Sequence, residues 1–378
     1  MADEPAEDAK PRCRPLLTVE QQIAHLKSKG VTFDLCSEKE AVDYLHTGNN
    51  LLRTSSYRKL FPTKRQGPHS GEYAGLDFEH LRTLSSLDRQ LRQCFLDISI
   101  DIEHFARVHV LNQCEAQGED GYQIVRDYMA QLNHGGRNHL EGSLKARGSD
   151  GLTRDEYSGG LIAKHLGEGE HIDRMPVWVL LETIEFRAFN DFFLFCAQRW
   201  GDETMLQQHY VLKSVRAMRN ACAHNACIVN GVGQNAGKCD TRTNELVTGS
   251  LNAHGMKRSK SRRAKLSNLR VSQMAATLYA DSMLCPREST RERHAAALGE
   301  LRLAWSADEA LFAKNPAVTS FFDFSSNSLT SGCPPAHNNF TCKTFGFVGA
   351  EPLSGSAPFF APWASRGGRT LTPLAPRA

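Results

Sequence analysis

Residues 76–116, LDFEHLRTLSSLDRQLRQCFLDISIDIEHFARVHVLNQCEA, form the stretch that decides the fold. Apolar side chains recur through it at steps of three and four residues: Leu84, Leu87, Leu91, Phe95, Ile98, Ile102, Phe105 and Val108. This spacing places them on one face of a helix, and neither proline nor glycine interrupts the run. The stretch is longer than an average helix, so we expect either one long central helix or two consecutive helices.

Two shorter helices are expected before this stretch, because each begins with a capping box. Thr18 is followed three residues later by Gln21, and Ser37 is followed three residues later by Glu40. In this pattern the first side chain binds a backbone amide of the helix, and the second side chain binds back. Gly30 lies where the first of these helices should stop.

Short helices, GYQIVRDYMAQL among them, are expected within residues 116–174, and further helices after Pro176. This proline stands in the favoured position before the apolar run VWVLLETIEFRAFNDFFLF, which we interpret as one buried amphipathic helix. Two closing helices follow, at 271–284 and 290–305. Almost no run alternates with a period of two, so the sequence predicts an all-α fold.

Composition indicates a soluble cytoplasmic protein. Hydrophobic residues make up 40% of the 378 residues and charged residues 23%, as in ordinary globular proteins. The eleven cysteines show no CxxC pair and no regular spacing, which indicates reduced thiols inside a cell. We expect neither a signal peptide nor a membrane-spanning helix, because the first residues lack a basic stretch followed by an apolar one and no apolar run reaches about eighteen residues. The net charge of +3 permits a nucleic-acid partner but does not argue for one.

The chain is expected to consist of one folded domain with two disordered ends. Residues 1–14 are polar and contain proline, so we expect them to be disordered. Seven of the fifteen prolines fall between Pro334 and Pro376, where charged residues are sparse, which predicts a disordered low-complexity tail over 325–378. The helical domain is therefore expected to span residues 15–324.

A second stretch, SVRAMRNACAHNACIVNG at 214–231, carries the candidate chemistry. At 100° per residue, one apolar stripe is made of Val211, Val215, Met218 and Cys222. Asn220 and His224 fall on the opposite face one turn apart, and Arg219 lies at the border between the faces. The helix should therefore present these three polar residues outward, together, while the stripe holds it in place.

Arg219, Asn220 and His224 are the residue types that RNA cleavage needs. Histidine titrates near neutral pH, so it can take the proton of the 2′-hydroxyl or protonate the leaving 5′-oxygen. Arginine can stabilise the charged phosphorane, and asparagine can hold the phosphate or orient the imidazole. This chemistry requires neither a metal nor a cofactor. On spacing alone, an ordinary solvated helix face remains the stronger interpretation, because R-x4-H occurs by chance in many chains.

The sequence RNACAHN resembles the R-N-x-x-x-H signature of HEPN-fold ribonucleases. More specifically, residues 16–310 resemble the Abi family of bacterial abortive-infection proteins, of the AbiD/AbiF type. The similarity also rests on an opening helix, LTVEQQIAHLKSKGVTF, and on a D-x-x-L-R…I-E-x-x-x-R helix with Asp88, Leu91, Arg92, Ile102, Glu103 and Arg107 in place. A P-x-W-x-x-x-E segment follows, through Pro176, Trp178 and Glu182.

The resemblance implies a HEPN-like helical bundle with additional helices that forms a homodimer with a composite site at its interface. It also implies a metal-independent endoribonuclease that leaves 2′,3′-cyclic phosphate and 5′-hydroxyl ends. The setting would be phage defence or a toxin–antitoxin system, with RNA and an antitoxin or phage-derived trigger as partners. The alternative is a catalytically inactive HEPN-like module that binds RNA or protein. The alternative is favoured by the run after His224, NACIVNGVGQNAG, which departs from the family and has no arginine before Arg242.

Further charged residues allow two interpretations each. The basic run Lys257, Arg258, Lys260, Arg262, Arg263 and Lys265 either tracks an RNA backbone or forms a solvated loop. Glu103 and Arg107 are four residues apart on one helix. They either form an intrahelical ion pair or lie beside the active site and position its catalytic residues. Arg89 or Arg92 could instead face the RNA.

No metal site is expected. His165 and His171 flank two glutamates, but neighbouring glycines and the wrong helical spacing argue against metal binding. Cys222 and Cys227 should point to different faces.

Overall fold

The computed structural model describes residues 16–149, 156–166, 172–232, 241–253 and 259–323. These residues form helices and turns with no β-strand, and two isolated bridges join Thr32 to Asp77 and Thr63 to Tyr73. The all-α prediction is therefore confirmed. The chain divides into two units, Met1–Pro335 and Ala336–Ala378, and every described residue belongs to the first. The predicted disordered segments 1–14 and 325–378 lie outside the described residues.

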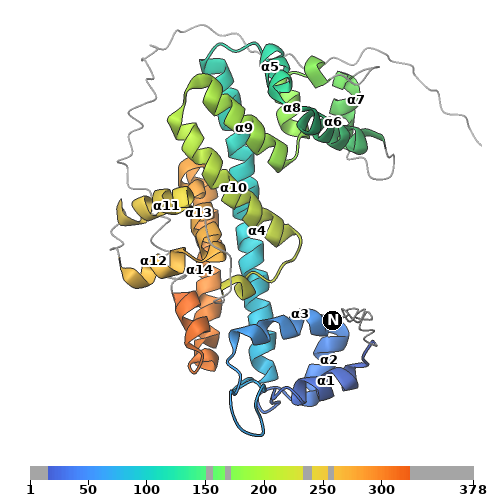
Figure 1. Ribbon diagram of the computed structural model, residues 1–378, viewed down its shortest axis with the longest axis vertical. Coiled ribbons are helices and arrows are strands. Elements are labelled where there is room, and N and C mark those ends of the chain that lie inside the picture. Colours follow the sequence, from blue (N-terminus) through green and yellow to red (C-terminus); the bar gives the residue numbers. More distant parts are fainter. Residues whose placement is uncertain (1–15, 150–155, 167–171, 233–240, 254–258, 324–378) are drawn as a thin grey trace, which may run out of the picture. The chain divides into compact units, whose positions relative to one another are not determined.

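The centre of the fold is one continuous helix, α4 (Phe78–Ala116), of 39 residues (Figure 1). Of the two expectations, the single long helix is the observed one. Asp77 caps its start by accepting a hydrogen bond from the Glu79 amide at 2.9 Å. Of the eight apolar side chains that predicted it, all are buried except Val108, which is half-buried.

Short helices pack around the beginning of α4. Both predicted capping boxes are present, at Thr18 with Gln21 and at Ser37 with Glu40. Gly30 adopts a φ of 82°, in the left-handed region that a glycine allows at such a turn. The elements are α1 (Val19–Lys27), α2 (Glu38–Asp43), the π-helical turn η1 (Tyr44–Gly48), α3 (Leu51–Thr54) and the 3₁₀ turn η2 (Ser55–Leu60).

A second group of helices follows α4: α5 (Gln123–Gln131), α6 (His134–Ser149), α7 (Glu156–Leu166), the turn η3 (Ile172–Arg174), α8 (Val177–Thr183) and α9 (Phe186–Trp200). The prediction of one helix after Pro176 is wrong, because Ile184 and Glu185 are extended and separate α8 from α9. Arg107 explains why the break is stable. Its Nη2 donates to the Ile184 carbonyl at 3.0 Å and so satisfies a group that a continuing helix would have used.

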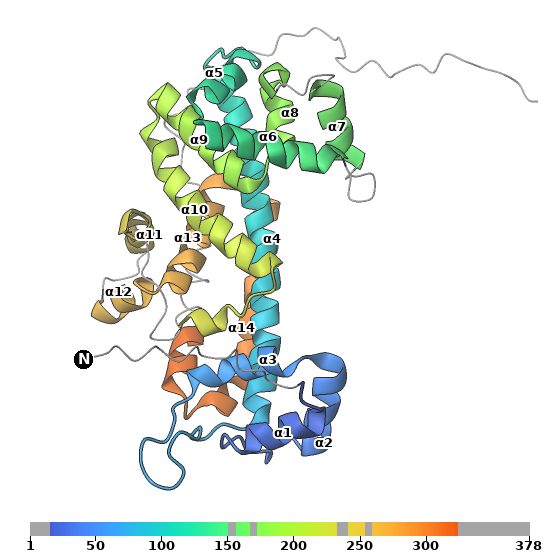
Figure 2. The same ribbon diagram turned by 45° about the vertical axis from the view of Figure 1, so that its right-hand side comes forward.

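The last helices complete the packing on α4: α10 (Glu203–Ala223), the turn η4 (Val229–Val232), α11 (Thr241–Ala253), α12 (Lys260–Leu266), α13 (Leu269–Leu284), α14 (Glu288–Asp308) and the turn η5 (Glu309–Phe312). The two predicted closing helices correspond to α13 and α14. Helices α10, α13 and α14 all pack directly against α4, and α10 also packs against α9 and α13 (Figures 1 and 2). Among the described helices, none combines the length and apolar character that a membrane crossing requires.

Candidate functional site

The end of α10 presents the three candidate residues largely as predicted. The stripe of Val211, Val215, Met218 and Cys222 is buried, while Asn220 and His224 are exposed. The side chain of Arg219 is 38% exposed, which fits its place at the border of the two faces. The helix ends at Ala223, so His224 is the cap residue that follows the last helical turn.

A defined backbone motif fixes the chain around His224. The amide of Ala226 donates to the carbonyl of Ala221 at 2.8 Å, and the amide of Asn225 donates to that of Cys222 at 3.0 Å. Asn225 has a φ of 57°, the left-handed conformation that closes a helix in this Schellman pattern. Two of the orphan carbonyls at the helix end are satisfied in this way, and the backbone of His224 is held between them.

Arg53 fastens this helix end to α3. Its two guanidinium nitrogens donate to the backbone oxygen of Asn225 at 2.6 Å and to the side-chain oxygen at 2.8 Å. Both acceptors are neutral, so the positive charge of Arg53 is not cancelled by them. The imidazole of His224, in contrast, makes no hydrogen bond to any of the described residues.

Glu103 connects Arg219 to α4. Its carboxylate binds Nη2 of Arg107 at 2.5 Å and lies 3.9 Å from Nε of Arg219. The side chains of Glu103 and Arg107 are only 15% and 14% exposed, so this pair is shielded from solvent screening. The guanidinium of Arg219 also donates to the Asn220 side chain at 3.4 Å. Glu103 and Arg107 therefore form the intrahelical pair, and Glu103 also lies beside Arg219.

A fully buried carboxylate, Asp88, holds the segment that follows His224. One oxygen accepts the backbone amides of Ile228 at 2.9 Å and Val229 at 3.0 Å. The other accepts the Tyr57 hydroxyl at 2.7 Å and a guanidinium nitrogen of Arg92. Arg92 is itself buried and donates a further bond to the Ala226 carbonyl at 3.3 Å. Asp88 and Arg92 are therefore occupied within the fold, and Arg92 does not face solvent.

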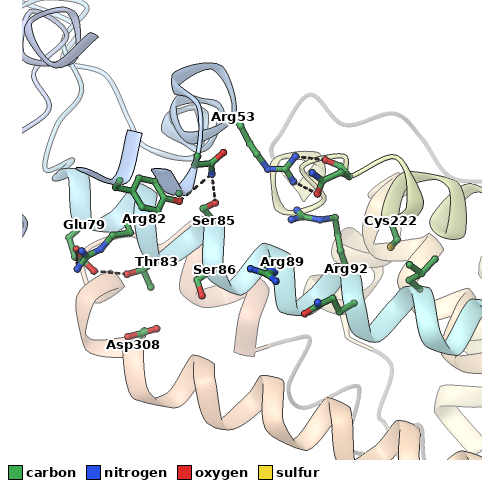
Figure 3. A pocket seen from close by; sticks show the side chains of 16 residues that line it. Arg53, Glu79, Arg82, Thr83, Ser85, Ser86, Arg89, Arg92, Cys222 and Asp308 are labelled. Atoms are coloured by element: carbon green, nitrogen blue, oxygen red, sulfur yellow. Dashed lines mark hydrogen bonds and ion pairs between the residues drawn. The ribbon is translucent and has the colours of Figure 1, made fainter. Parts of the chain in front are cut away.

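A polar pocket of about 870 Å³ lies along α4 and reaches the end of α10 (Figure 3). Four arginines line it: Arg53, Arg82, Arg89 and Arg92. Cys222 and Asn225 belong to its wall, so the pocket adjoins the backbone that holds His224. Burial raises the pKa of the Cys222 thiol to about 12, which keeps it protonated and unsuited to act as a nucleophile there.

The structure does not bring the basic run to this end of α10. Lys257 and Arg258 lie outside the described residues. Lys260, Arg262, Arg263 and Lys265 belong to α12, which packs on α13 and lies on the side of α13 away from the end of α10 (Figures 1 and 2). Lys265 donates to the Ser320 carbonyl at 2.8 Å, and burial lowers its pKa. Lys265 thus ties α12 to the segment around Ser320, 55 residues later in the sequence, whereas Lys260 and Arg263 are exposed.

One group in the described part of the chain, Asp97, Asp101 and His294, offers three ligand atoms close enough for a metal. These groups already satisfy one another. The buried imidazole of His294 is bonded to Asp101 and Asp281, each at 2.9 Å, and Arg293 pairs with both Asp97 and Asp101. Of the histidines weighed as ligands from the sequence, His165 is half-buried on α7 and His171 lies outside the described residues.

Reasoning from the sequence missed Arg53 and Tyr57. Arg53 precedes its partner Asn225 by 172 residues, and Tyr57 precedes Asp88 by 31 residues. Local periodicity carries no information on such contacts. The one available signal was an asparagine directly after a helix end, since asparagine tolerates the left-handed conformation.

Comparison with known proteins supports the expected family over part of the chain. Residues 46–230, just under half of the chain, match the family model described as Abi-like protein. The match is narrower than the expected 16–310, but it contains α3, α4 and α10 and therefore the contacts of Asp88, Glu103 and Arg219. No curated protein and no solved structure matches the chain. The segment that holds these contacts is thus similar to the Abi-like proteins.

Proposed function

We propose that this protein is a metal-independent endoribonuclease of the HEPN type, acting in phage defence by abortive infection. The observation that carries the proposal is the exposure of Asn220 and His224 at one fixed helix end, with the partly exposed Arg219 beside Glu103. The match of residues 46–230 to the Abi-like proteins supports the biological setting.

Each side chain has a role that its surroundings support. Arg219 stabilises the negative charge of the phosphorane, because a guanidinium stays charged and binds phosphate oxygens in a fork. Glu103 limits the rotation of Arg219 and so presents it in a defined orientation. His224 transfers a proton to or from the reacting oxygens, and its exposure leaves both ring nitrogens accessible. Asn220 positions the phosphate or the imidazole.

The active form proposed is a homodimer. Within one chain, no described residue orients the imidazole of His224, although a general base works best when a second group fixes its direction. A second copy that packs its own α10 end against the first would supply groups from both chains around one phosphate. Dimerisation also keeps the exposed face of Asn220 and His224 away from bulk water.

A second candidate function is an RNA-binding or protein-binding module without cleavage. The lack of an orienting partner for His224 in the single chain favours it. The two functions differ in one respect: the binding module needs the charge of Arg219 but not the titrating imidazole of His224.

The decisive experiment compares wild type with His224→Ala on a mixed RNA pool in EDTA and maps the cleaved ends. We expect wild type to leave 2′,3′-cyclic phosphate and 5′-hydroxyl ends, and His224→Ala to be slower by about 10²- to 10⁴-fold. His139→Ala, which changes an exposed histidine on α6, is the matched control and should cut like wild type. Intact RNA with wild type, or equal cutting by His224→Ala, would assign the binding function instead.

Sedimentation analysis tests the dimer separately. We expect the wild-type protein to sediment as a dimer at the concentrations at which it cleaves RNA. Cleavage by a protein that stays monomeric at those concentrations would refute the composite site while leaving the roles of Arg219 and His224 open to the EDTA experiment.

A further inference from the structure

The arginine-lined pocket on α4 contains two guanidinium groups whose charge the described residues do not cancel. Arg53 donates only to the neutral oxygens of Asn225. Arg89 is exposed, and its side chain makes no hydrogen bond or ion pair with any other described residue. The other two arginines are neutralised, Arg82 by Glu79 at 2.6 Å and Arg92 by Asp88.

The charges are unevenly distributed along the pocket. Two carboxylates line the pocket, those of Glu79 and Asp308. Both lie near Arg82, at the end of the pocket that is away from α10 (Figure 3). Glu79 is committed to Arg82 and to the Thr83 hydroxyl at 3.1 Å. The half that reaches α10 therefore has an excess of positive charge from Arg53 and Arg89. An anion would bind in that half.

The remaining lining suits a chain of phosphate and ribose groups. Arg82 and Arg89 are seven residues apart on α4, hence on the same face and about 10.5 Å apart along the helix axis. Between and beside them, Ser85, Ser86, Gln93 and Asn49 contribute hydroxyl and amide groups. Few apolar side chains line the pocket, so it does not resemble a site for an apolar ligand.

We propose that this pocket binds the phosphodiester backbone of single-stranded RNA and guides it to the end of α10, with Arg89 and Arg53 as the phosphate-binding residues. The inference rests on the proposed function and extends it to the path of the substrate. Arg89 and Glu103, the neighbour of Arg219, are separated by about 21 Å along α4, so Arg89 binds a different phosphate from the one that Arg219 contacts. An RNA that occupies both places must therefore span several nucleotides.

The test measures binding of a fluorescent single-stranded RNA to full-length His224→Ala protein, in which cleavage is expected to be slow, with and without Arg89→Gln. We expect Arg89→Gln to weaken binding roughly fivefold to tenfold. We also expect the slope of log affinity against log salt to fall by about 0.7, the loss of one phosphate contact on a single strand. Arg126→Gln, an exposed arginine on α5, is the matched control and should change neither quantity.

Two further arms distinguish the ligand. Arg89→Lys keeps the charge but loses the fork, so we expect it to retain the salt slope and to bind with intermediate affinity. A mononucleotide and a polyglutamate peptide serve as competitors, and neither should displace the RNA at equal concentration. Displacement by the mononucleotide would indicate a nucleotide site, and displacement by the peptide an acidic protein partner; either result overturns the proposal.

The outcome is separable from that of the nuclease proposal. If wild type cleaves RNA but Arg89→Gln leaves both affinity and salt slope unchanged, the pocket does not bind the backbone and the nuclease assignment stands. If wild type leaves RNA intact while Arg89→Gln weakens binding as expected, the pocket assignment stands without the nuclease. Circular dichroism of each variant verifies the fold, which replacing an exposed side chain without hydrogen bonds or ion pairs should not affect.

Discussion

Replacing Asp88 with asparagine tests the contacts that hold the segment after His224. Asp88 is fully buried and accepts four hydrogen bonds: two from backbone amides, one from Tyr57 and one from Arg92. Asparagine has nearly the same shape but only one acceptor oxygen. If that oxygen keeps the two amides, the new NH₂ group faces Tyr57 and Arg92. The Tyr57 hydroxyl can rotate and accept a hydrogen bond from this NH₂ group. The Arg92 guanidinium cannot, because it has only donors.

The expected loss of stability follows from the hydrogen-bond acceptors that remain for Arg92. Its side chain is 7% exposed, and without Asp88 its only remaining described acceptor is the Ala226 carbonyl at 3.3 Å. Breaking a buried ion pair by removing one partner costs about 3–5 kcal/mol, because the other charge stays buried. Whole domains are stable by about 5–15 kcal/mol, so this loss is large on that scale. Burial, and then the charge of Asp88, raise the pKa of Tyr57, which therefore stays a neutral donor.

Urea unfolding, monitored by circular dichroism, measures this loss of stability. An unchanged slope of unfolding free energy against urea concentration indicates that the folded and unfolded states are otherwise the same. Asp173→Asn, at an exposed aspartate, is the control and should stay within about 0.5 kcal/mol of wild type. Adding Arg92→Met to Asp88→Asn removes the stranded charge and should restore part of the loss, which a double-mutant cycle quantifies. A cost below about 1 kcal/mol for Asp88→Asn would refute the reasoning.

Two other predictions concern charged groups in the fold. Glu103→Gln should lower kcat for RNA cleavage about tenfold with little change in KM, because it frees Arg219 to rotate; steady-state kinetics checks this, and an unchanged kcat contradicts it. His294 lies between Asp281 and Asp101; burial alone lowers its pKa, but hydrogen bonds and charge from both carboxylates raise it overall. Its stabilising contribution should therefore be complete below about pH 6.5 and disappear as the pH rises through the elevated folded-state pKa. The difference in unfolding free energy between wild type and His294→Asn should shrink from pH 6 to pH 9, and a constant difference would count against the ion pairs.

Most of the helices could be predicted because their signals are local. The run of apolar residues from Leu84 to Phe105 and the capping boxes at Thr18 and Ser37 depend only on neighbours within a few positions. The break at Ile184 could not be predicted, since it depends on Arg107, which is 77 residues away in the sequence. The apolar pattern continues across the break, and periodicity alone therefore indicated one helix.

The candidate site could likewise be predicted from the sequence only where its signals are local. The outward face of Asn220 and His224 follows from the 100° step of a helix and is observed. The contacts of Arg53 with Asn225 and of Asp88 with the Ile228 amide join distant segments, so no local pattern indicates them. The basic run 257–265 was conspicuous in the sequence for its charge alone, yet its described part packs on the far side of α13.

The continuity of α4 fixes the distance between the residues that lie along it. A helix of 39 residues measures about 58 Å, and it resists bending without a proline or glycine in its interior. Arg89 and Glu103 both belong to this straight helix. The distance between Arg89 in the pocket and Arg219 is therefore determined by the number of residues between Arg89 and Glu103, and not by the motion of a loop. An RNA held at the pocket would then be cut at a constant offset from the held nucleotide, whatever its sequence. Inserting a single residue into α4 between the two positions would rotate one against the other by about 100° and abolish that register.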